Sequence, residues 1–186
     1  MSTIFLRGKS DFSAVTQKKI CMLGDFSVGK TSLVRRFVEE KFSDKYLSTI
    51  GAKINRKNVL IETDDQSVKI AMLIWDLAGG EKFDQIMNSY YRGAAGAILV
   101  CDLTRPETLK ALPRYADDFW SVNSHKPLLV VGNKLDLIEE QPGLAIDDLA
   151  GVAEQCQAPY FMSSAKTGEN VEAMFVALAQ RLLRVK

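Results

Sequence analysis

The chain has little of several features that would point to other kinds of function. Its 24 Lys and Arg residues nearly balance 23 Asp and Glu residues, so a net charge of +1 offers no basic surface for nucleic acid. One histidine and three scattered cysteines make a metal cluster or a disulfide framework a poor interpretation, and buried free thiols the better one. No apolar run reaches membrane-spanning length, and the first residues do not resemble a signal peptide.

These absences predict a cytoplasmic monomer with no nucleic-acid partner. Ser2 stands where N-myristoylation needs glycine, and the last five residues contain no cysteine for prenylation. We therefore expect no lipid anchor in the chain as given, although a chain whose tail had been removed would look the same.

The length of 186 residues suits one α/β domain with a sizeable core. We expect residues 1–17 to form an N-terminal extension and residues 18–186 to form the domain. Short apolar runs bounded by polar turns are typical of strands buried on both faces of a mostly parallel sheet. These runs lie at residues 18–23, 97–101, 128–131 and 160–162.

Two further segments, 54–62 and 67–75, predict an antiparallel hairpin around the polar turn Asp64-Asp65-Gln66. Between the strands, helical spacing of apolar residues predicts helices at 32–38, 108–122, 147–155 and 169–183. The alternation predicts a doubly wound, mostly parallel six-stranded sheet with one antiparallel hairpin strand. In such a fold the ligand binds at the carboxyl ends of the strands.

The strongest motif is Gly-Asp-Phe-Ser-Val-Gly-Lys-Thr at residues 24–31, which matches the phosphate-binding P-loop at each fixed position. It lies between a strand and a helix start, where consecutive backbone N–H groups form a concave site for phosphate oxygens. Lys30 can reach the outer phosphates, and the Thr31 hydroxyl can ligate Mg²⁺. A glycine loop that only turns the chain is the alternative.

The segment Asn133-Lys134-Leu135-Asp136 follows an apolar strand and indicates which base is bound. The Asp136 carboxylate can accept hydrogen bonds from two adjacent donors. Guanine presents an N1–H and an exocyclic amine side by side, whereas adenine does not. The stem of Lys134 can cover one face of the base, and Asn133 can brace the loop. The sequence therefore predicts a guanine nucleotide.

Other strings follow in a recognisable order: Thr49-Ile50-Gly51, Trp-Asp-Leu-Ala-Gly at 75–79, Tyr-Tyr-Arg-Gly-Ala at 90–94 and Ser164-Ala165-Lys166. With these motifs the chain resembles the small GTPases of the Ras superfamily, and the Rab branch most closely, from residue 18 to about residue 184. The resemblance implies a P-loop small GTPase fold and a molecular switch that binds GTP/GDP with Mg²⁺ and hydrolyses GTP.

The resemblance also implies roles for particular residues. Phe42 matches the aromatic ring that packs edge-on against guanine, and the Ala165 N–H matches the donor to the guanine carbonyl oxygen. Thr31, Thr49 and Asp76 match the magnesium site. Lys30, Thr49, Gly79 and Gly80 occupy the catalytic positions. The implied nucleotide contacts are Asp25, Phe26, Ser27, Val28, Gly29, Lys30, Thr31, Ser32, Phe42, Thr49, Gly79, Asn133, Lys134, Asp136, Ser164, Ala165 and Lys166.

The chain departs from the family at three informative positions. Gly80 stands where the family has the glutamine that orients the attacking water, and Phe26 replaces a small residue beside the γ-phosphate. Ile54 replaces an aromatic residue that forms a partner-binding surface with Trp75 and Tyr90. Loss of water positioning and charge stabilisation can lower the rate of phosphoryl transfer by factors of about 10³–10⁵.

Three functions can be compared against these residues. A GTP/GDP switch with weak hydrolysis, bound by effectors and regulators through Ile54, Trp75 and Tyr90, uses the whole set. A pseudo-GTPase scaffold that does not cycle fits Gly80 and Phe26, but it leaves Thr31, Thr49 and Asp76 unexplained. An ATP-using enzyme conflicts with Asp136 and Ala165.

Overall fold

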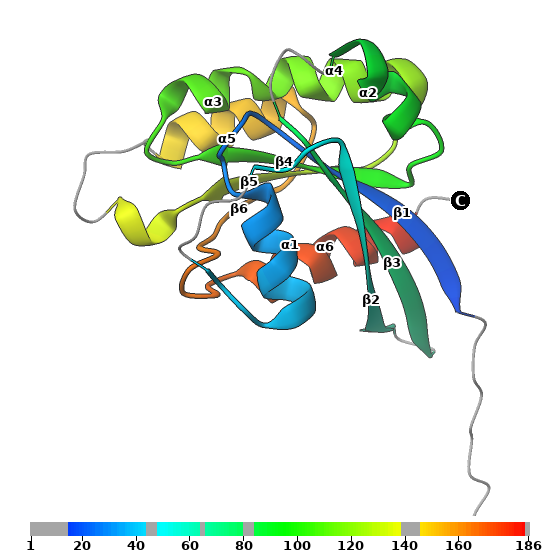
Figure 1. Cartoon of the computed structure of the whole chain (residues 1–186). Coiled ribbons are helices and arrows are strands. Elements are labelled where there is room, and N and C mark those ends of the chain that lie inside the picture. The colour runs from blue at the N-terminus through cyan, green and yellow to red at the C-terminus, as the bar shows by residue number, and fades with distance from the viewer. Residues whose placement is uncertain (1–14, 44–47, 64–65, 80–83, 139–145, 185–186) are drawn as a thin grey trace, which may run out of the picture.

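A six-stranded sheet forms the centre of the molecule in the computed structural model, which describes residues 15–43, 48–63, 66–79, 84–138 and 146–184 (Figure 1). The strand order is β2-β3-β1-β4-β5-β6. The β2–β3 pair is antiparallel and the other pairs are parallel. The strands are β1 (Thr16–Leu23), β2 (Ala52–Glu62), β3 (Ser67–Leu77), β4 (Gly96–Asp102), β5 (Leu128–Asn133) and β6 (Tyr160–Met162). The predicted fold class is confirmed.

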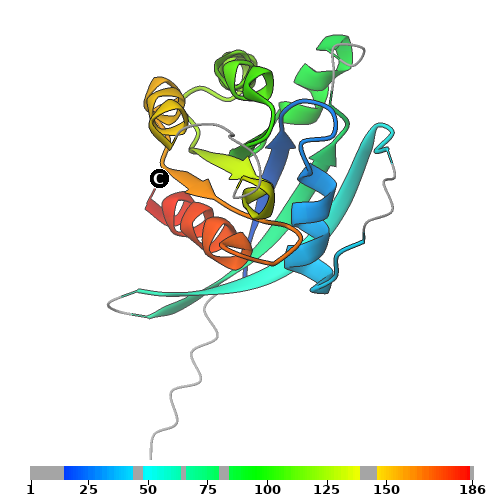
Figure 2. The ribbon, with the colours of Figure 1, turned by 90° about the vertical axis from the view of Figure 1, so that its left-hand side faces the viewer.

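Helices cover both faces of the sheet (Figures 1 and 2). On one face lie α1 (Lys30–Glu39) and α6 (Val171–Arg184). On the other lie α2 (Asp84–Tyr91), α3 (Pro106–Lys110), α4 (Leu112–Val122) and α5 (Ile146–Gln155), and the short 3₁₀ helix η2 (Leu135–Leu137) follows β5. Each face has its own hydrophobic core. None of the helices in the described ranges is long and apolar enough to span a membrane.

The central strands are apolar because both of their faces are covered. Every residue of β4 and of β5 is buried, as expected for strands between two helix layers. The edge strand β2 instead alternates between exposed and half-buried positions along most of its length. Cys21, Cys101 and Cys156 are buried free thiols, as the sequence predicts.

The single helix predicted at 108–122 is wrong, because the structure divides this region into α3 and α4 at Ala111. Pro113 lies in the first turn of α4. Proline has no N–H, and its ring collides with the carbonyl four residues earlier, so a continuous helix cannot pass through this position. At the first turn of a new helix, where that N–H has no partner anyway, proline is well tolerated.

The hairpin strands are longer than predicted, and the extra residues bring β3 to the ligand edge of the sheet. Ala52 pairs with Leu77, and the Ala78 N–H donates to the Gly51 carbonyl at 2.9 Å. At the amino end, β1 starts at Thr16, inside the predicted extension. Asp64 and Asp65 of the predicted turn lie outside the described residues.

Chain topology gathers the motifs at one edge. From β1 the chain passes through α1 and the hairpin to β3 on one side, and then to β4 on the other side of β1. The loops that follow β1, β3, β4, β5 and β6 therefore meet at the carboxyl edge of the sheet, where open α/β folds bind their ligands.

The face covered by α1 and α6 depends on a pair of stacked rings, which gives a stability prediction. Phe37 and Phe175 stack with ring centroids 4.0 Å apart, and Phe175 is fully buried. We expect Phe175→Ala to lower the free energy of unfolding by about 3–5 kcal/mol, because it removes buried apolar contacts and leaves a cavity. Urea unfolding measures this loss.

The control for this prediction is Leu60→Ala, since Leu60 is an exposed apolar residue on the edge strand β2. Substitutions at such exposed sites change stability by about 0.5 kcal/mol or less. If the two variants lost the same free energy of unfolding in one buffer, that result would contradict the importance of the stacked pair.

Candidate nucleotide and magnesium site

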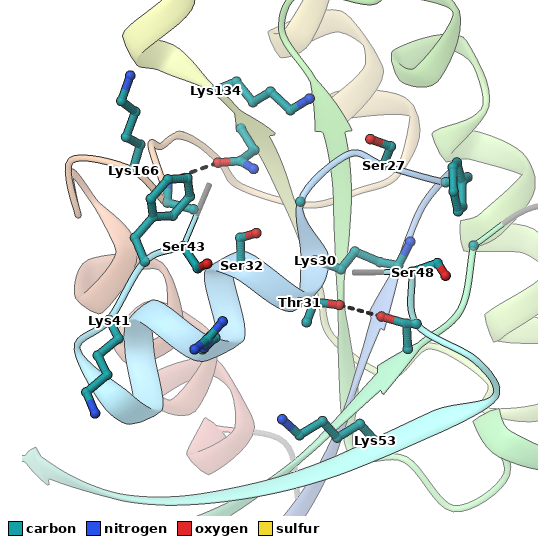
Figure 3. Close-up of a pocket in the computed structure, with 18 of the residues that line it drawn as sticks. Ser27, Lys30, Thr31, Ser32, Lys41, Ser43, Ser48, Lys53, Lys134 and Lys166 are labelled. Carbon is teal, nitrogen blue, oxygen red and sulfur yellow. Dashed lines mark hydrogen bonds between the residues drawn. The ribbon is translucent and has the colours of Figure 1, made fainter. Parts of the chain in front are cut away.

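A cleft of about 780 Å³ opens at the carboxyl edge of the sheet (Figure 3). Most of the predicted nucleotide-binding residues line it, and Asp25, Val28 and Ser164 do not. The predicted residues that line the cleft are Phe26, Ser27, Gly29, Lys30, Thr31, Ser32, Phe42, Thr49, Gly79, Asn133, Lys134, Asp136, Ala165 and Lys166. The fold thus brings together residues that are up to 140 positions apart, from Phe26 to Lys166.

The P-loop backbone has a conformation that favours glycine where it turns into α1. Gly29 caps α1 with φ +97°, and a Cβ at this position would lie 2.2 Å from Asn133 Nδ2. Ser27 also has positive φ, at 64°. The first N–H groups of a helix have no partner within the helix and can bind anions, and this turn places the start of α1 at the cleft, which Lys30 and Thr31 line.

Lys30 places a buried cation in this loop. Its side chain is 6% exposed, and Nζ donates to the carbonyls of Gly24 at 2.6 Å and Asp25 at 2.8 Å. Burial lowers the pKa of Lys30 to about 8, and the charge of Asp76 partly opposes this shift. Gly79 approaches so closely that a Cβ there would lie 2.6 Å from Nζ.

Two hydroxyls and one carboxylate meet beside Lys30. The Thr31 hydroxyl donates to Asp76 Oδ2 at 2.6 Å. Its oxygen also lies 2.6 Å from the Thr49 hydroxyl oxygen, and a dashed line from Thr31 marks this contact in Figure 3. Asp76 is fully buried, and its Oδ1 has no hydrogen-bond partner. Burial raises the pKa of Asp76, while the Thr31 hydrogen bond and the charge of Lys30 act in the opposite direction.

This arrangement fits a bound magnesium ion. Mg²⁺ prefers oxygen ligands, usually from one or two carboxylates together with other oxygens. An unpartnered buried carboxylate oxygen is costly, and a cation can satisfy it. Among the residues that the structure describes, no group of three or more His, Cys, Asp and Glu side chains forms another metal site.

Asn133 connects the two ends of the cleft. From the end of β5, its Nδ2 donates to the Val28 carbonyl at 2.9 Å, and its Oδ1 accepts from the Ala165 N–H at 3.1 Å. Asn133 is 2% exposed. The bracing that the sequence assigns to this residue therefore joins the P-loop to the loop between β6 and α6.

The Asp136 carboxylate and its neighbours form the opposite end of the cleft from the P-loop. The Ser164 hydroxyl donates to Asp136 Oδ1 at 2.5 Å, and Lys166 Nζ lies 3.9 Å from Oδ2. A carboxylate held this way can accept two donors from the edge of a base. Lys134 has a positive φ of 69° and also lines the cleft.

Sequence reasoning missed a buried ion-pair network behind the P-loop. Asp102, at the end of β4, accepts from Lys134 Nζ at 2.6 Å and from Arg105 Nε at 3.1 Å. Burial alone would raise the pKa of Asp102, but hydrogen bonds from Lys134 and Thr104 outweigh it and lower the pKa. Arg105 Nη2 also donates to the Phe26 carbonyl at 2.8 Å.

A second missed contact joins the P-loop to α4, where the Tyr115 hydroxyl donates to Asp25 Oδ1 at 2.8 Å. For Asp102 a signal was available, since an acidic residue directly follows a fully apolar strand. No local pattern marks Tyr115, because the contact spans 90 residues of sequence.

The positions at which the chain departs from the family pattern lie in different settings. The Phe26 side chain is 51% exposed at the cleft, whereas Gly80 lies outside the described residues. Ile54 is 54% exposed and pairs with Trp75 across β2 and β3. The rings of Trp75 and Tyr90 lie 6.3 Å apart, and Lys19 Nζ lies 4.0 Å from the centroid of the Trp75 ring.

Comparison with known proteins gives the family. A model of the Ras family matches residues 19–184. The chain belongs to the Ras family, as a Rab-like small GTPase. It is 38% identical to the Ras-related protein Rab7 of Drosophila melanogaster over 177 residues, which cover 90% of this chain and 81% of that protein.

Two further relatives show similar identity. The Ras-related protein Rab-1 of Theileria annulata is 40% identical over 172 residues, covering 88% of this chain and 73% of the relative. The Ras-related protein SEC4 of Saccharomyces cerevisiae is 39% identical over 166 residues, covering 87% and 73%. This Rab-like protein is thus a GTP-binding molecular switch of the hydrolase class, and its cleft is where the motifs of that class meet.

The hydrogen bonds of Asn133 give a prediction for this Rab-like protein. Asn133→Ala leaves the Val28 carbonyl and the Ala165 N–H without their partner at the cleft. We expect GDP to dissociate at least about tenfold faster, since a lost buried hydrogen-bond partner costs about 1–3 kcal/mol. Displacement of fluorescent GDP by excess unlabelled GDP measures the rate.

Asn123 provides a matched control, because it is also buried and also bridges two backbone groups. It donates to the Tyr91 carbonyl at 2.8 Å and accepts from the Gly93 N–H at 3.1 Å, away from the cleft. Asn123→Ala is expected to lower stability and leave GDP dissociation unchanged. Similar dissociation rates in the two variants would contradict the role of Asn133.

Proposed function

We propose that this Rab-like GTPase is a GTP/GDP switch whose own hydrolysis is slow, on the order of 10⁻⁴ s⁻¹ or less. One observation carries the proposal: Gly80 offers no side chain to hold the attacking water, while the residues for nucleotide and metal are present. A slow switch stays in the GTP state until a partner supplies what the chain lacks.

We propose that the phosphates bind to residues 25–32, which include Lys30. Backbone N–H groups of the P-loop and the buried Lys30 ammonium hold the phosphates, and the Gly79 N–H donates to the γ-phosphate. Thr31, Thr49 and Asp76 would hold Mg²⁺, which when bound neutralises charge on the phosphate oxygens. The unpartnered Asp76 Oδ1 supports this assignment.

The base end is proposed to select guanine. Asp136 accepts the N1–H and the exocyclic amine, and Lys134 and Phe42 enclose the ring. Ser164, Ala165 and Lys166 complete the contact. The Ala165 N–H donates to Asn133 Oδ1 at 3.1 Å in this structure and would be shared with the guanine carbonyl oxygen. The short Ser164–Asp136 hydrogen bond supports the proposal, because it fixes the carboxylate at the cleft.

The missing glutamine leaves the attacking water without a partner from the chain. Phe26 adds bulk to the phosphate end of the cleft, because its exposed side chain lines the cleft together with Lys30. Arg105 contacts this loop, but its guanidinium already donates to the Phe26 carbonyl and to Asp102. A partner is therefore expected to supply both water positioning and positive charge.

Partners are proposed to bind at the surface formed by Ile54, Trp75 and Tyr90, beside the loops that carry Thr49 and Gly79. Ile54 is exposed, and Trp75 and Tyr90 are half-buried. Accessible apolar side chains next to a nucleotide-sensing loop suit a contact whose affinity differs between two states. The aliphatic Ile54 favours effectors other than those that need an aromatic ring there. We also propose a cytoplasmic monomer in which the N-terminal extension lies outside the GTPase domain and ends where β1 begins at Thr16.

A pseudo-GTPase scaffold is the second candidate, and the combination of Gly80 and Phe26 favours it. It would hold nucleotide permanently and would not distinguish GTP from GDP. The switch is favoured instead by the contacts among Thr31, Thr49 and Asp76, because a scaffold has no need to sense the γ-phosphate. Equal partner affinity in the two nucleotide states would favour the scaffold.

The slow rate is tested by single-turnover hydrolysis of bound GTP. We expect a wild-type rate on the order of 10⁻⁴ s⁻¹ or less and a rise of at least about tenfold in Gly80→Gln, because the amide can orient the water. Gly80→Ala is the matched control, since it stiffens the backbone without adding an amide. A wild-type rate near one per second would refute the proposal.

Guanine selection is tested by Asp136→Asn. Replacing the carboxylate by an amide puts a donor where an acceptor is needed, so GDP affinity should fall by about a hundredfold or more. Xanthosine diphosphate, which has a carbonyl in place of the exocyclic amine, should gain affinity. Asp147→Asn, on the exposed side of α5, is the control. Unchanged guanine preference, measured by competition with fluorescent GDP, would count against the assignment.

A further inference from the structure

Arg36 makes three contacts with backbone carbonyls from two separate segments. It lies in the last turn of α1. Its Nε donates to the Ala165 carbonyl at 2.9 Å, its Nη2 donates to the Lys166 carbonyl, and its Nη1 lies 3.4 Å from the Glu40 carbonyl. Neither the motifs nor the proposed function assigns this side chain a role.

Two of the three carbonyls belong to residues that line the base end of the cleft, and the third belongs to Glu40, which directly precedes lining residues. Ala165 and Lys166 line one wall, on the loop between β6 and α6, which lies beside α1 in both views (Figures 1 and 2). Glu40 ends α1 with φ 58° and leads into Lys41 and Phe42, which line the other wall. A single guanidinium therefore spans the two segments that would enclose a base.

The chemistry of these contacts requires an arginine. Two parallel N–H groups of the planar guanidinium can meet two consecutive carbonyls, whereas a lysine ammonium is a single point of charge on a flexible stem. Such charge-assisted hydrogen bonds are stronger than neutral ones. The positive charge also lies at the carboxyl end of α1, where the helix dipole favours it.

The rest of the loop depends on this fixed position. The Gly168 N–H donates to the Ser164 carbonyl at 2.8 Å, and the Ser164 hydroxyl holds Asp136 at 2.5 Å. Arg36 ties the same loop to α1, and α1 begins at Lys30 in the P-loop. A shift of the loop would therefore move its contacts with the base, whereas Lys30 would stay at the start of α1.

We propose that Arg36 is a positioning residue that holds the walls of the base pocket together and so sets how long a guanine nucleotide stays bound. The inference rests on the proposed guanine site and adds a control of nucleotide release to it. None of the three carbonyls that Arg36 contacts belongs to a proposed phosphate or metal contact, so Arg36 acts on nucleotide release and not on hydrolysis.

The first test compares nucleotide release with hydrolysis in the full chain loaded with Mg²⁺ and fluorescent GDP. In Arg36→Gln, GDP should dissociate about tenfold or more faster, and single-turnover hydrolysis of bound GTP should stay within about twofold of wild type. GDP dissociation from Arg36→Lys should be faster than from wild type and slower than from Arg36→Gln. Arg184→Gln, in the last turn of α6 and away from the cleft, is the matched control and should behave like wild type.

The second test uses 6-thioguanosine diphosphate, in which sulfur replaces the carbonyl oxygen of the base. Sulfur is the weaker acceptor, so wild-type protein should release this analogue faster than GDP. In Arg36→Gln the ratio of the two rates should approach one, because the loop would no longer keep the Ala165 N–H, which Asn133 Oδ1 also accepts, within reach of the base. A general loss of stability would speed both releases and leave the ratio unchanged.

Three results would overturn the proposal: unchanged GDP release in Arg36→Gln, a parallel loss of hydrolysis, or an unchanged analogue ratio, including the absence of any sulfur effect in wild type. Failure of the guanine site itself is distinguishable. In that case wild-type protein would not retain GDP at all, whereas failure of the Arg36 proposal alone would leave tight GDP binding in both proteins.

Discussion

The two hydrogen bonds of the Asn133 side chain hold the cleft in shape. Through them the end of β5 is tied to the P-loop at the Val28 carbonyl and to the following loop at the Ala165 N–H. Gly29 is required partly for this reason, since a side chain there would occupy the place of the amide. A single buried amide thus keeps a phosphate site and a base site, built from distant parts of the sequence, at a fixed separation.

Two buried charged groups in the cleft, one ammonium and one carboxylate, are not fully compensated without a ligand. A buried ammonium is held by P-loop carbonyls, and a buried carboxylate oxygen of Asp76 has no partner. Both groups lose solvation in the interior. Burial favours the neutral form of each, because it lowers the pKa of Lys30 and raises the pKa of Asp76. Phosphate oxygens beside the ammonium and a divalent cation beside the carboxylate would offset these costs, which explains why this Rab-like protein keeps both groups.

Local chemistry explains which parts of the structure the sequence could predict. Fully apolar runs identified β4 and β5, because such strands are covered on both faces, and the P-loop identified the phosphate end of the site. The boundary between α3 and α4 could also have been predicted from Pro113, but apolar residues at helical spacing on both sides of it favoured a single helix. The contacts of Arg36 with Ala165, of Arg105 with Phe26 and of Tyr115 with Asp25 could not be predicted, because each of these joins residues at least 79 positions apart. Such contacts depend on which loops the strand order brings together.

The buried thiols have a practical consequence. Only the thiolate reacts readily with electrophiles, and burial raises the pKa of Cys21 and of Cys101 to about 12 and that of Cys156 to about 11. A fluorophore attached to a cysteine added at the surface would therefore meet almost no background at neutral pH. Conversely, slow alkylation of the native three would report how often the interior of the folded chain opens to solvent.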